Sequence, residues 1–353
     1  MRVKNTDRAD SVGVDGLNAA DAGVRLLAGA VANVNAAGLL LVCCGDVGGV
    51  GPEATRLVLD VRETMGGVAR PVIVGPGLEA PLQPRFEHAL MWPRAHLGKD
   101  FTRQCVARAA CSLVEGGRLW CAVRKDKGAD SVGEFMAAVF GNVTTQRREQ
   151  RYRLLSSDRG AEIDRVLTHD TLALRYRIDD LLLDGLVVHA CPGVFSRRGL
   201  DAGTRLLIEH VSAMEVAPRH VVDLGTGVGP LALWAARRWS ASVTAVDSNA
   251  LAVAMCRENA AASGLGSLVH VSLCDGLPDR PTPAELALVN PPTHADPATL
   301  ARLLGSLRAW LRPGAPALAV VSRSGRAIEA FEAAGARVGT HTYQGYTVVE
   351  ARW

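Results

Sequence analysis

The stretch Val221-Val-Asp-Leu-Gly-Thr-Gly-Val-Gly-Pro230 decides how the C-terminal half of this chain folds. Its apolar start is typical of a buried strand, and its three glycines predict a tight turn, because glycine tolerates positive φ and leaves space above the backbone. Pro230 favours the first turn of a helix. A strand, a glycine turn and a helix in this order can hold a ligand at the turn. Taken alone, the pattern also fits a tight turn that binds nothing.

Outward from this stretch, strands alternate with amphipathic helices as far as the C-terminus. The predicted strands are residues 220–224, 242–247, 268–273, 286–290 and 315–322, with a final pair that ends near Arg352. The predicted helices are residues 230–238, 249–263 and 297–311. This alternation predicts an α/β domain with a mainly parallel sheet, helices on both faces and an antiparallel C-terminal strand.

Carboxylates follow two of these predicted strands. Asp247 ends the second strand, roughly 20 residues after the glycine turn, where a carboxylate can accept hydrogen bonds from both hydroxyls of a ribose. Asp275 follows the third strand and could accept a hydrogen bond from the amino group of adenine. The carboxyl ends of parallel strands meet at one edge of a sheet, so we expect both carboxylates in one crevice beside the glycine turn.

The fourth predicted strand ends in Asn290-Pro-Pro-Thr293, the segment most informative about a reaction. Pro291 and Pro292 lack an amide donor, so the nearby carbonyls and the side-chain oxygen of Asn290 stay available as hydrogen-bond acceptors. Such acceptors can hold a planar amino group and stabilise the positive charge that its nitrogen gains in methyl transfer. A rigid turn with no catalytic part is the alternative.

The composition bounds the class of protein. Of 353 residues, 48% are hydrophobic and 21% are charged, which predicts two folded domains rather than disorder. Residues 1–15 mix both charge signs and do not resemble a secretory signal, and polar residues interrupt the most apolar stretch, 24–44, so we expect a cytoplasmic protein without a membrane span. The net charge of +3 neither demands nor excludes an RNA substrate. The eight cysteines include no CxxC pair, so we expect reduced thiols and no metal site.

The first half of the chain reads as a degenerate copy of the second. Gly45-Asp-Val-Gly-Gly-Val-Gly-Pro52 follows a predicted strand over 39–44, and its Gly-Val-Gly-Pro matches the end of the glycine turn. This alignment puts Gly45 opposite Asp223 and Val47 opposite Gly225.

A second strand is predicted over 71–74 and ends in Gly75, where the C-terminal copy has Asp247. We prefer duplication with loss of the site in the first copy over two unrelated α/β domains. The expected domains are 1–150 and 181–353, joined by a linker and edge segment over 151–180. The Arg-rich bridge 146–153 is expected to be an exposed linker or an edge.

Residues 181–353 resemble the class I S-adenosylmethionine-dependent methyltransferases of the small rRNA methyltransferase family, which modify N2 of guanine in ribosomal RNA. The resemblance rests on Leu181-Leu-Leu-Asp-Gly-Leu186, Pro192-Gly-Val-Phe-Ser196, Leu200-Asp-Ala-Gly-Thr204, the glycine turn and Asn290-Pro-Pro292. In the first half, Trp92-Pro-Arg94 and Lys125-Asp-Lys-Gly-Ala-Asp-Ser131 resemble the family's non-catalytic duplicate. The resemblance therefore implies two tandem Rossmann-like methyltransferase folds, with a degenerate first copy that holds RNA or stabilises the second.

The resemblance also implies a cofactor, S-adenosylmethionine, and an RNA partner, above all ribosomal RNA. The residues implied for cofactor binding are Asp223, Gly225, Thr226, Gly227, Gly229, Asp247, Ser248, Asp275 and Phe195. The implied catalytic residues are Asn290, Pro291 and Pro292. Those implied for substrate contact are Thr293, His294 and Arg197.

One residue departs from the family pattern. The family usually has an aromatic residue after Asn-Pro-Pro, and this chain has Thr293. Because stacking of a base on an aromatic ring is worth roughly 1–3 kcal/mol, its loss favours a second hypothesis, N-methylation of a small molecule or antibiotic-like metabolite. A third hypothesis is a non-enzymatic RNA-binding or assembly module. Intact Asp223, Asp247 and Asn290 argue against the third.

Overall fold

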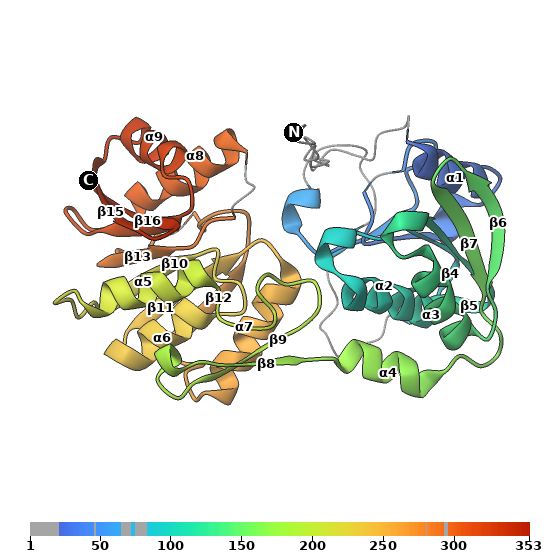
Figure 1. Cartoon of the computed structure of the whole chain (residues 1–353), viewed down its shortest axis with the longest axis horizontal. Helices are drawn as coiled ribbons and strands as arrows, with labels where there is room; N and C mark the ends of the chain where they lie inside the picture. Colours follow the sequence, from blue (N-terminus) through green and yellow to red (C-terminus); the bar gives the residue numbers. More distant parts are fainter. Residues whose placement is uncertain (1–20, 46, 65–71, 75–82, 280, 293–295) are drawn as a thin grey trace, which may run out of the picture. The chain divides into compact units, whose positions relative to one another are not determined.

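The chain forms two compact units, Met1–Ala173 and Leu174–Trp353, which are described in turn (Figure 1). The computed structural model describes residues 21–45, 47–64, 72–74, 83–279, 281–292 and 296–353. In each unit a seven-stranded sheet carries the helices on its faces.

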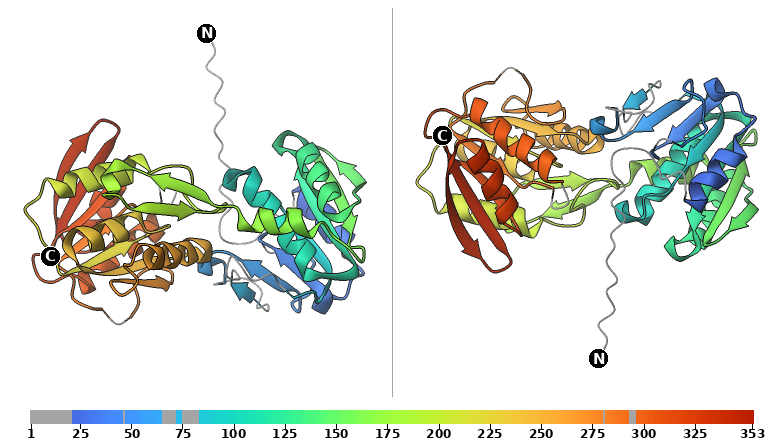
Figure 2. Two further views of the ribbon diagram at one scale, coloured as in Figure 1. Left: turned by 90° about the horizontal axis from the view of Figure 1, so that it is seen from below. Right: turned by 90° about the horizontal axis from the view of Figure 1, so that it is seen from above.

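The sheet of the second unit has the strand order β12-β11-β10-β13-β14-β16-β15. Its first five strands are parallel, and β16 runs antiparallel to both of its neighbours, so that the β15–β16 hairpin forms one edge (Figure 2). The strands are β10 (His220–Leu224), β11 (Ser242–Asp247), β12 (Val269–Leu273), β13 (Leu286–Val289), β14 (Ala317–Val321), β15 (Arg337–Tyr343) and β16 (Tyr346–Arg352). The helices are α5 (Ala202–Ser212), α6 (Pro230–Trp239), α7 (Ala250–Ala262), α8 (Pro297–Ser306) and α9 (Gly325–Ala333). The predicted mainly parallel sheet and antiparallel end are confirmed.

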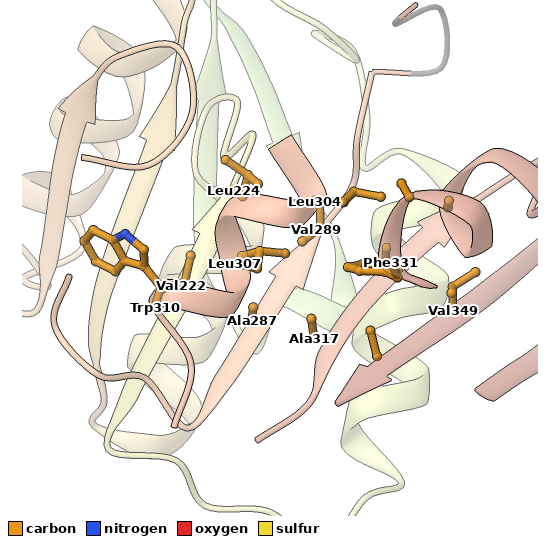
Figure 3. Packing of buried hydrophobic residues seen from close by; sticks show 14 of the residues in the cluster. Val222, Leu224, Ala287, Val289, Leu304, Leu307, Trp310, Ala317, Phe331 and Val349 are labelled. Carbon is orange, nitrogen blue, oxygen red and sulfur yellow. The ribbon is translucent and has the colours of Figure 1, made fainter. Parts of the chain in front are cut away.

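The core on one face of this sheet fixes which side chains point to the other face. Val222 and Leu224 of β10 lie in a cluster with Leu304 of α8 and the fully buried Phe331 of α9 (Figure 3). Because side chains alternate along a strand, Asp223 lies on the opposite face of β10. The alternation of side chains along β10 thus directs the Asp223 carboxylate away from this cluster, two residues before Gly225 of the glycine loop.

A small two-stranded sheet precedes the large one in the second unit. It pairs β8 (Tyr176–Asp179) with β9 (Val187–Ala190) in antiparallel fashion. The buried Asn259 of α7 joins β9 to the glycine loop: its Nδ2 donates to the carbonyls of His189, at 2.8 Å, and Val228, at 2.9 Å. Its Oδ1 accepts from the His189 amide at 2.9 Å. One buried amide therefore satisfies three backbone groups that the sheets leave unpaired.

The sheet of the first unit repeats the same order, β3-β2-β1-β4-β5-β7-β6. Its strands are β1 (Leu39–Val42), β2 (Thr55–Val58), β3 (Val72–Val74), β4 (Phe86–Met91), β5 (Leu113–Arg124), β6 (Thr144–Glu149) and β7 (Tyr152–Asp158). Its α-helices are α1 (Ala22–Ala30), α2 (Lys99–Ser112), α3 (Ala129–Phe140) and α4 (Arg165–Ala173). Short 3-10 helices lie at Ala36–Gly38, Val61–Thr64, Ala95–Leu97 and Lys125–Lys127 here, and at Leu181–Leu183 and Leu307–Ala309 in the second unit. The shared strand order supports the duplication.

The residue alignment drawn from Gly-Val-Gly-Pro is wrong. The second strand of the first unit is β2, and the predicted strand 71–74 is the third, β3. The amide of Cys43 donates to Leu57 as that of Gly225 donates to Val246, and both residues have positive φ, 47° and 81°. Cys43 is therefore the counterpart of Gly225.

From this register, Leu41 lies opposite Asp223, and Val58 lies opposite Asp247. The four-letter match misled because residues 48–54 hold turns and bends and no helix before β2 begins, whereas Pro230 opens α6. Gly75 lies outside the described residues. The first copy still lacks both carboxylates, since apolar residues stand at the two positions.

The expected boundaries at 150 and 180 are also wrong. Residues 152–158 form β7, which pairs with β5 inside the first sheet, and α4 completes the first unit before the division at 173. Of the two alternatives for the bridge 146–153, the edge is correct, since β6 is the exposed edge strand of this sheet. Hydrogen bonding along β5 keeps this segment in the first unit, although its polar sequence is typical of a linker.

Two expectations from composition concern cysteines and membranes. All eight cysteines are free thiols, and six of them are buried. Across the described ranges, no helix combines the length and apolarity that a membrane span requires.

We expect Asn259→Ala to lower the free energy of unfolding by about 2–4 kcal/mol, because it leaves three backbone groups without partners, at the buried Val228 and the half-buried His189. Urea unfolding of the full chain measures the change. Asn142 is a matched control: it bonds the same three kinds of backbone group, at Phe140 and Asp158, but is exposed. Asn142→Ala should cost about 1 kcal/mol or less, because water replaces the amide. Equal losses would contradict the role assigned to burial.

Candidate functional site

The glycine loop between β10 and α6 has two kinds of glycine. Gly225, Gly227 and Gly229 all have positive φ, at 81°, 56° and 96°. A Cβ on Gly229 would lie 2.6 Å from the Sγ of Cys256, so this glycine is required by packing. A Cβ on Gly227 would meet nothing within 4 Å. Gly227 therefore borders open space that a ligand can enter, whereas Gly229 does not.

Asp223 is the buried carboxyl beneath this loop. It has no exposed surface, and its Oδ2 accepts a hydrogen bond from the Thr226 hydroxyl at 2.7 Å. Its Oδ1 has no hydrogen-bond partner of standard geometry among the described residues. Burial raises the pKa of Asp223 to about 7, opposed by the Thr226 hydrogen bond and the Ala232 amide. Because this carboxyl has no exposed surface, it supports the loop from beneath, and its contact with a cofactor stays a prediction.

The carboxylate of Asp247 is oriented by two backbone amides. Its Oδ2 accepts from Gly227 at 2.9 Å, and its Oδ1 accepts from Asn249 at 2.8 Å. The carboxylate is half-buried, and a carboxylate oxygen can accept more than one hydrogen bond. Asn249 then caps α7 and donates from Nδ2 to the carbonyl of Gly193, at 3.1 Å. The predicted cofactor residue Ser248 lies between them and is half-buried.

Asp275 lies after β12 and is held by an arginine that the sequence did not indicate. Nη2 of Arg302, on α8, lies 2.6 Å from Oδ2 of Asp275, and Nη1 donates to the Asp275 carbonyl at 3.1 Å. The Asp275 side chain is only 13% exposed. The pair fixes one carboxylate oxygen, and a contact between Asp275 and a cofactor stays a prediction.

Asn290, the residue after β13, is held by the start of α5. Its Nδ2 donates to Oδ2 of Asp201 at 2.8 Å and to Oγ1 of Thr204 at 2.9 Å. No described residue donates a hydrogen bond to its Oδ1. Its backbone carbonyl lies 3.6 Å from where a Cβ of Gly225 would stand, so the Asn-Pro-Pro segment and the glycine loop face each other. Pro291 is buried and Pro292 is exposed.

The remaining predicted residues lie on the segment before α5 or outside the described ranges. Phe195 is 67% exposed, and whether it covers a cofactor stays a prediction. The guanidinium of Arg197 lies over the ring of Tyr176, 5.9 Å from its centroid, as does that of Arg198, at 5.5 Å. Thr293 and His294 lie outside the described residues. The geometry therefore brings together the glycine loop, Asp223, Asp247 and Asn290 and leaves the substrate residues as predictions.

Sequence reasoning missed the residues that orient this site. Asp201 caps α5 by accepting from the Thr204 amide, and an acidic residue at this position is a signal that could have indicated the cap but no contact with Asn290. Arg302 and Asn259 carry no local signal. Among the described residues, no group of three histidine, cysteine or acidic side chains could hold a metal ion.

Residues 185–349 match the model of the family described as methyltransferase small domain. Among curated proteins, the chain is similar to a ribosomal RNA small subunit methyltransferase C of Pseudomonas paraeruginosa, with 35% identity over 187 residues, 51% of this chain and 52% of the relative. It is also similar to a ribosomal RNA large subunit methyltransferase G of Ectopseudomonas mendocina, with 32% identity over 200 residues, 56% of this chain and 50% of the relative. The matched segments thus span about half the length of each relative.

Among solved structures, the chain is similar to the 16S rRNA N2 methyltransferase RsmC of T. thermophilus, in complex with AdoMet and guanosine. The match has a TM-score of 0.77 and 23% identity, and it covers 94% of this chain and 92% of the other. At this identity the likeness concerns the fold, and it extends over both units.

The two glycines give opposite predictions. Gly229→Ala should lower the free energy of unfolding by about 2–4 kcal/mol, because it combines a left-handed backbone with a contact against Cys256. Gly227→Ala should cost only about 1 kcal/mol but weaken binding of S-adenosylmethionine at least about tenfold, because the methyl group enters the open space. Urea unfolding and titration calorimetry on both variants measure the two effects. Unchanged cofactor affinity in Gly227→Ala would remove this loop from the site.

Asp223 gives a pH-dependent prediction for the unliganded protein. The pKa of Asp223 is about 7 in the folded protein and 3.8 for an ordinary exposed aspartate, so between these pH values the folded state holds a proton that the unfolded state has lost. The contribution of Asp223 to stability therefore falls as pH rises from about 4 to 7, by roughly 4 kcal/mol at most. Asp223→Asn removes this titration. The difference in unfolding free energy between wild type and variant should decline over that window, and a constant difference would contradict the buried-carboxyl assignment.

Proposed function

Because residues 185–349 match the family described as methyltransferase small domain, we propose that this protein transfers a methyl group from S-adenosylmethionine to N2 of guanine in ribosomal RNA. The observation that carries the proposal is Asn290: its amide nitrogen is held on two sides, no described residue donates to its side-chain oxygen, and its backbone carbonyl faces the glycine loop. An rRNA substrate also implies that the protein acts in the cytoplasm.

The residues at the sheet edge fit this cofactor. The open space at Gly227 suits its methionine part, the carboxylate of Asp247, which two backbone amides orient, suits the ribose, and Asp275 suits the adenine amine. The cofactor supplies an electrophilic methyl group. The protein supplies placement, because every one of these groups is fixed by a backbone or side-chain partner before a ligand arrives.

Asn290 would orient the acceptor nitrogen. Its Oδ1 and the carbonyls of the Asn-Pro-Pro segment accept the two hydrogens of the planar amine, which directs the nitrogen lone pair out of the plane toward the methyl group. Positive charge develops on nitrogen as the new bond forms, and the same acceptors then bind more strongly. The methylated nitrogen afterwards releases one proton. This mechanism needs hydrogen-bond acceptors and no strong base.

The choice of guanine N2 and rRNA is supported by the named relatives. Two curated relatives are named for methylation of ribosomal RNA, one of the small subunit and one of the large, and the structural neighbour is named for N2 methylation of 16S rRNA and holds guanosine. The first unit has Leu41 and Val58 where the second has Asp223 and Asp247. We therefore propose one cofactor site per chain, with the first unit holding RNA or stabilising the second.

Thr293 favours a second candidate, a small-molecule amine, because no aromatic ring follows Asn-Pro-Pro to stack on a base. Labelled cofactor offered with small subunits, large subunits, protein-free rRNA and a metabolite extract separates the two. Label in guanine of rRNA supports the proposal, and label only in a metabolite replaces it.

Asn290→Ala should lower kcat by about a hundredfold or more and leave cofactor affinity nearly unchanged, because its benefit belongs to the transition state. Asn290→Asp should lose less, since a carboxylate still accepts from the amine. Turnover, cofactor affinity and melting temperature are measured on the same samples. If turnover falls only in proportion to unfolded protein, Asn290 is a structural residue and the amine-methylation proposal fails.

A further inference from the structure

We propose that Asp201 and Thr204 are positioning residues that set the direction of the Asn290 side-chain oxygen, an inference that rests on the proposed amine methylation. They stand at the start of α5, 89 and 86 residues away from Asn290 along the chain. They would touch neither cofactor nor substrate in this role. They act through Asn290.

The donor and acceptor chemistry at this point is unambiguous. The Asp201 carboxylate can only accept hydrogen bonds, so the Asn290 atom 2.8 Å away from it must be the amide nitrogen. The second contact, 2.9 Å to the Thr204 hydroxyl oxygen, uses the other hydrogen of the same nitrogen. A carboxamide is planar, so fixing both N–H directions also fixes where Oδ1 points. The oxygen cannot exchange places with the nitrogen without facing a carboxylate.

The helix start holds both partners in place. Oδ2 of Asp201 also accepts from the Thr204 backbone amide, at 3.1 Å, as the cap of α5. Thr204 is 5% exposed, so its hydroxyl is confined. The glycine between them follows from the same geometry: a Cβ on Gly203 would lie 3.0 Å from Oδ2 of Asp201 and 3.4 Å from Oδ1 of Asn290. The segment Asp201-Ala-Gly-Thr204 is thus shaped around Asn290.

The negative charge of Asp201 adds to the effect of placement. A carboxylate bonded to the N–H side of an amide polarises that amide and increases the negative charge on its oxygen. The oxygen then stabilises a nitrogen that becomes positive in the transition state. A cap with a purely structural role would change stability and would not change turnover per folded molecule, so the two roles can be separated.

Four variants separate the contributions. Asp201→Asn keeps an oxygen that can cap α5 and accept from Asn290, and it removes only the charge. Asp201→Ser keeps a capping hydroxyl that is too short to reach Asn290. Thr204→Val removes the hydroxyl and keeps the backbone amide that Asp201 caps. Thr204→Ser keeps both the hydroxyl and the amide. The matched control is Asp164→Ser in the first unit, because Asp164 accepts from the Leu167 amide three residues on, at 2.8 Å, and has no part in the site.

In a methyl-transfer assay on the full chain, Thr204→Val and Asp201→Ser should each lower kcat about tenfold, the effect of one lost hydrogen bond to a catalytic group. Asp201→Asn should lower kcat by a smaller factor. Cofactor affinity should stay within about twofold of wild type, and the melting temperature should fall no further than in Asp164→Ser. Thr204→Ser should recover most of the activity. If Asp201→Ser and Thr204→Val turn over as fast per folded molecule as Asp164→Ser, the inference is wrong.

A second readout needs no turnover. The side-chain amide signals of Asn290, identified by their loss in Asn290→Ala, should show two slowly exchanging protons in unliganded protein. One should shift and exchange faster in Thr204→Val, and the other in Asp201→Ser. If the wild type methylates no acceptor, the proposed function fails. The amide signals then test by themselves whether Asp201 and Thr204 orient the side chain of Asn290. Signals that are unchanged in both variants would overturn it even in an active enzyme.

Discussion

The candidate site depends on one backbone carbonyl oxygen, which fixes the start of the glycine loop. The oxygen of Val246, near the end of β11, accepts the amides of both Gly225 and Thr226, each at 2.9 Å. These bonds end the pairing of β10 and turn the chain across the sheet edge, where α6 begins at Pro230. The same turn brings the Gly227 amide to Asp247 and seals Asp223 beneath the loop. In the first unit the corresponding oxygen, on Leu57, accepts the amide of Cys43, and the described residues between Cys43 and β2 form no helix.

The first unit shows what the shared fold becomes when such a site is absent. At the end of β4, Trp92-Pro-Arg94 stands where the second unit has Asn290-Pro-Pro. Arg94 makes two bonds to the carboxylate of the buried Glu63, at 3.0 and 2.6 Å, and Arg56 donates to the carbonyl of Glu63 at 2.9 Å. At this edge an arginine occupies the carboxylate of Glu63, whereas at the edge of the second unit backbone amides orient the carboxylate of Asp247. The strand order persists because it depends on hydrophobic alternation along the strands, which ligand loss does not disturb.

The sequence predicted the elements of the second unit well, because each has a local cause. Strands 220–224 and 242–247 match to the residue, and Asn249 and Asp296 mark helix starts with their own side chains. The contacts that orient the site could not be predicted, because they join distant segments. Arg302 meets Asp275 across 27 residues, and Asp201 meets Asn290 across 89. The alignment of the two halves failed for a related reason: strand register is set by pairing between strands, and four matching letters in a loop carry no information about pairing.

Because α5 and β9 support the sheet edge, they limit where recombination in evolution can separate this domain from its neighbour. The open sheet begins at β10, yet Asn290 depends on the start of α5, and the glycine loop depends on Asn259 and β9. A recombination that fused another domain directly to residue 220 would keep the complete sheet but would lose α5 and β9, which support its edge. A segment that keeps the candidate site supported therefore starts no later than β9. The β8–β9 pair belongs functionally to the second unit and not to the first.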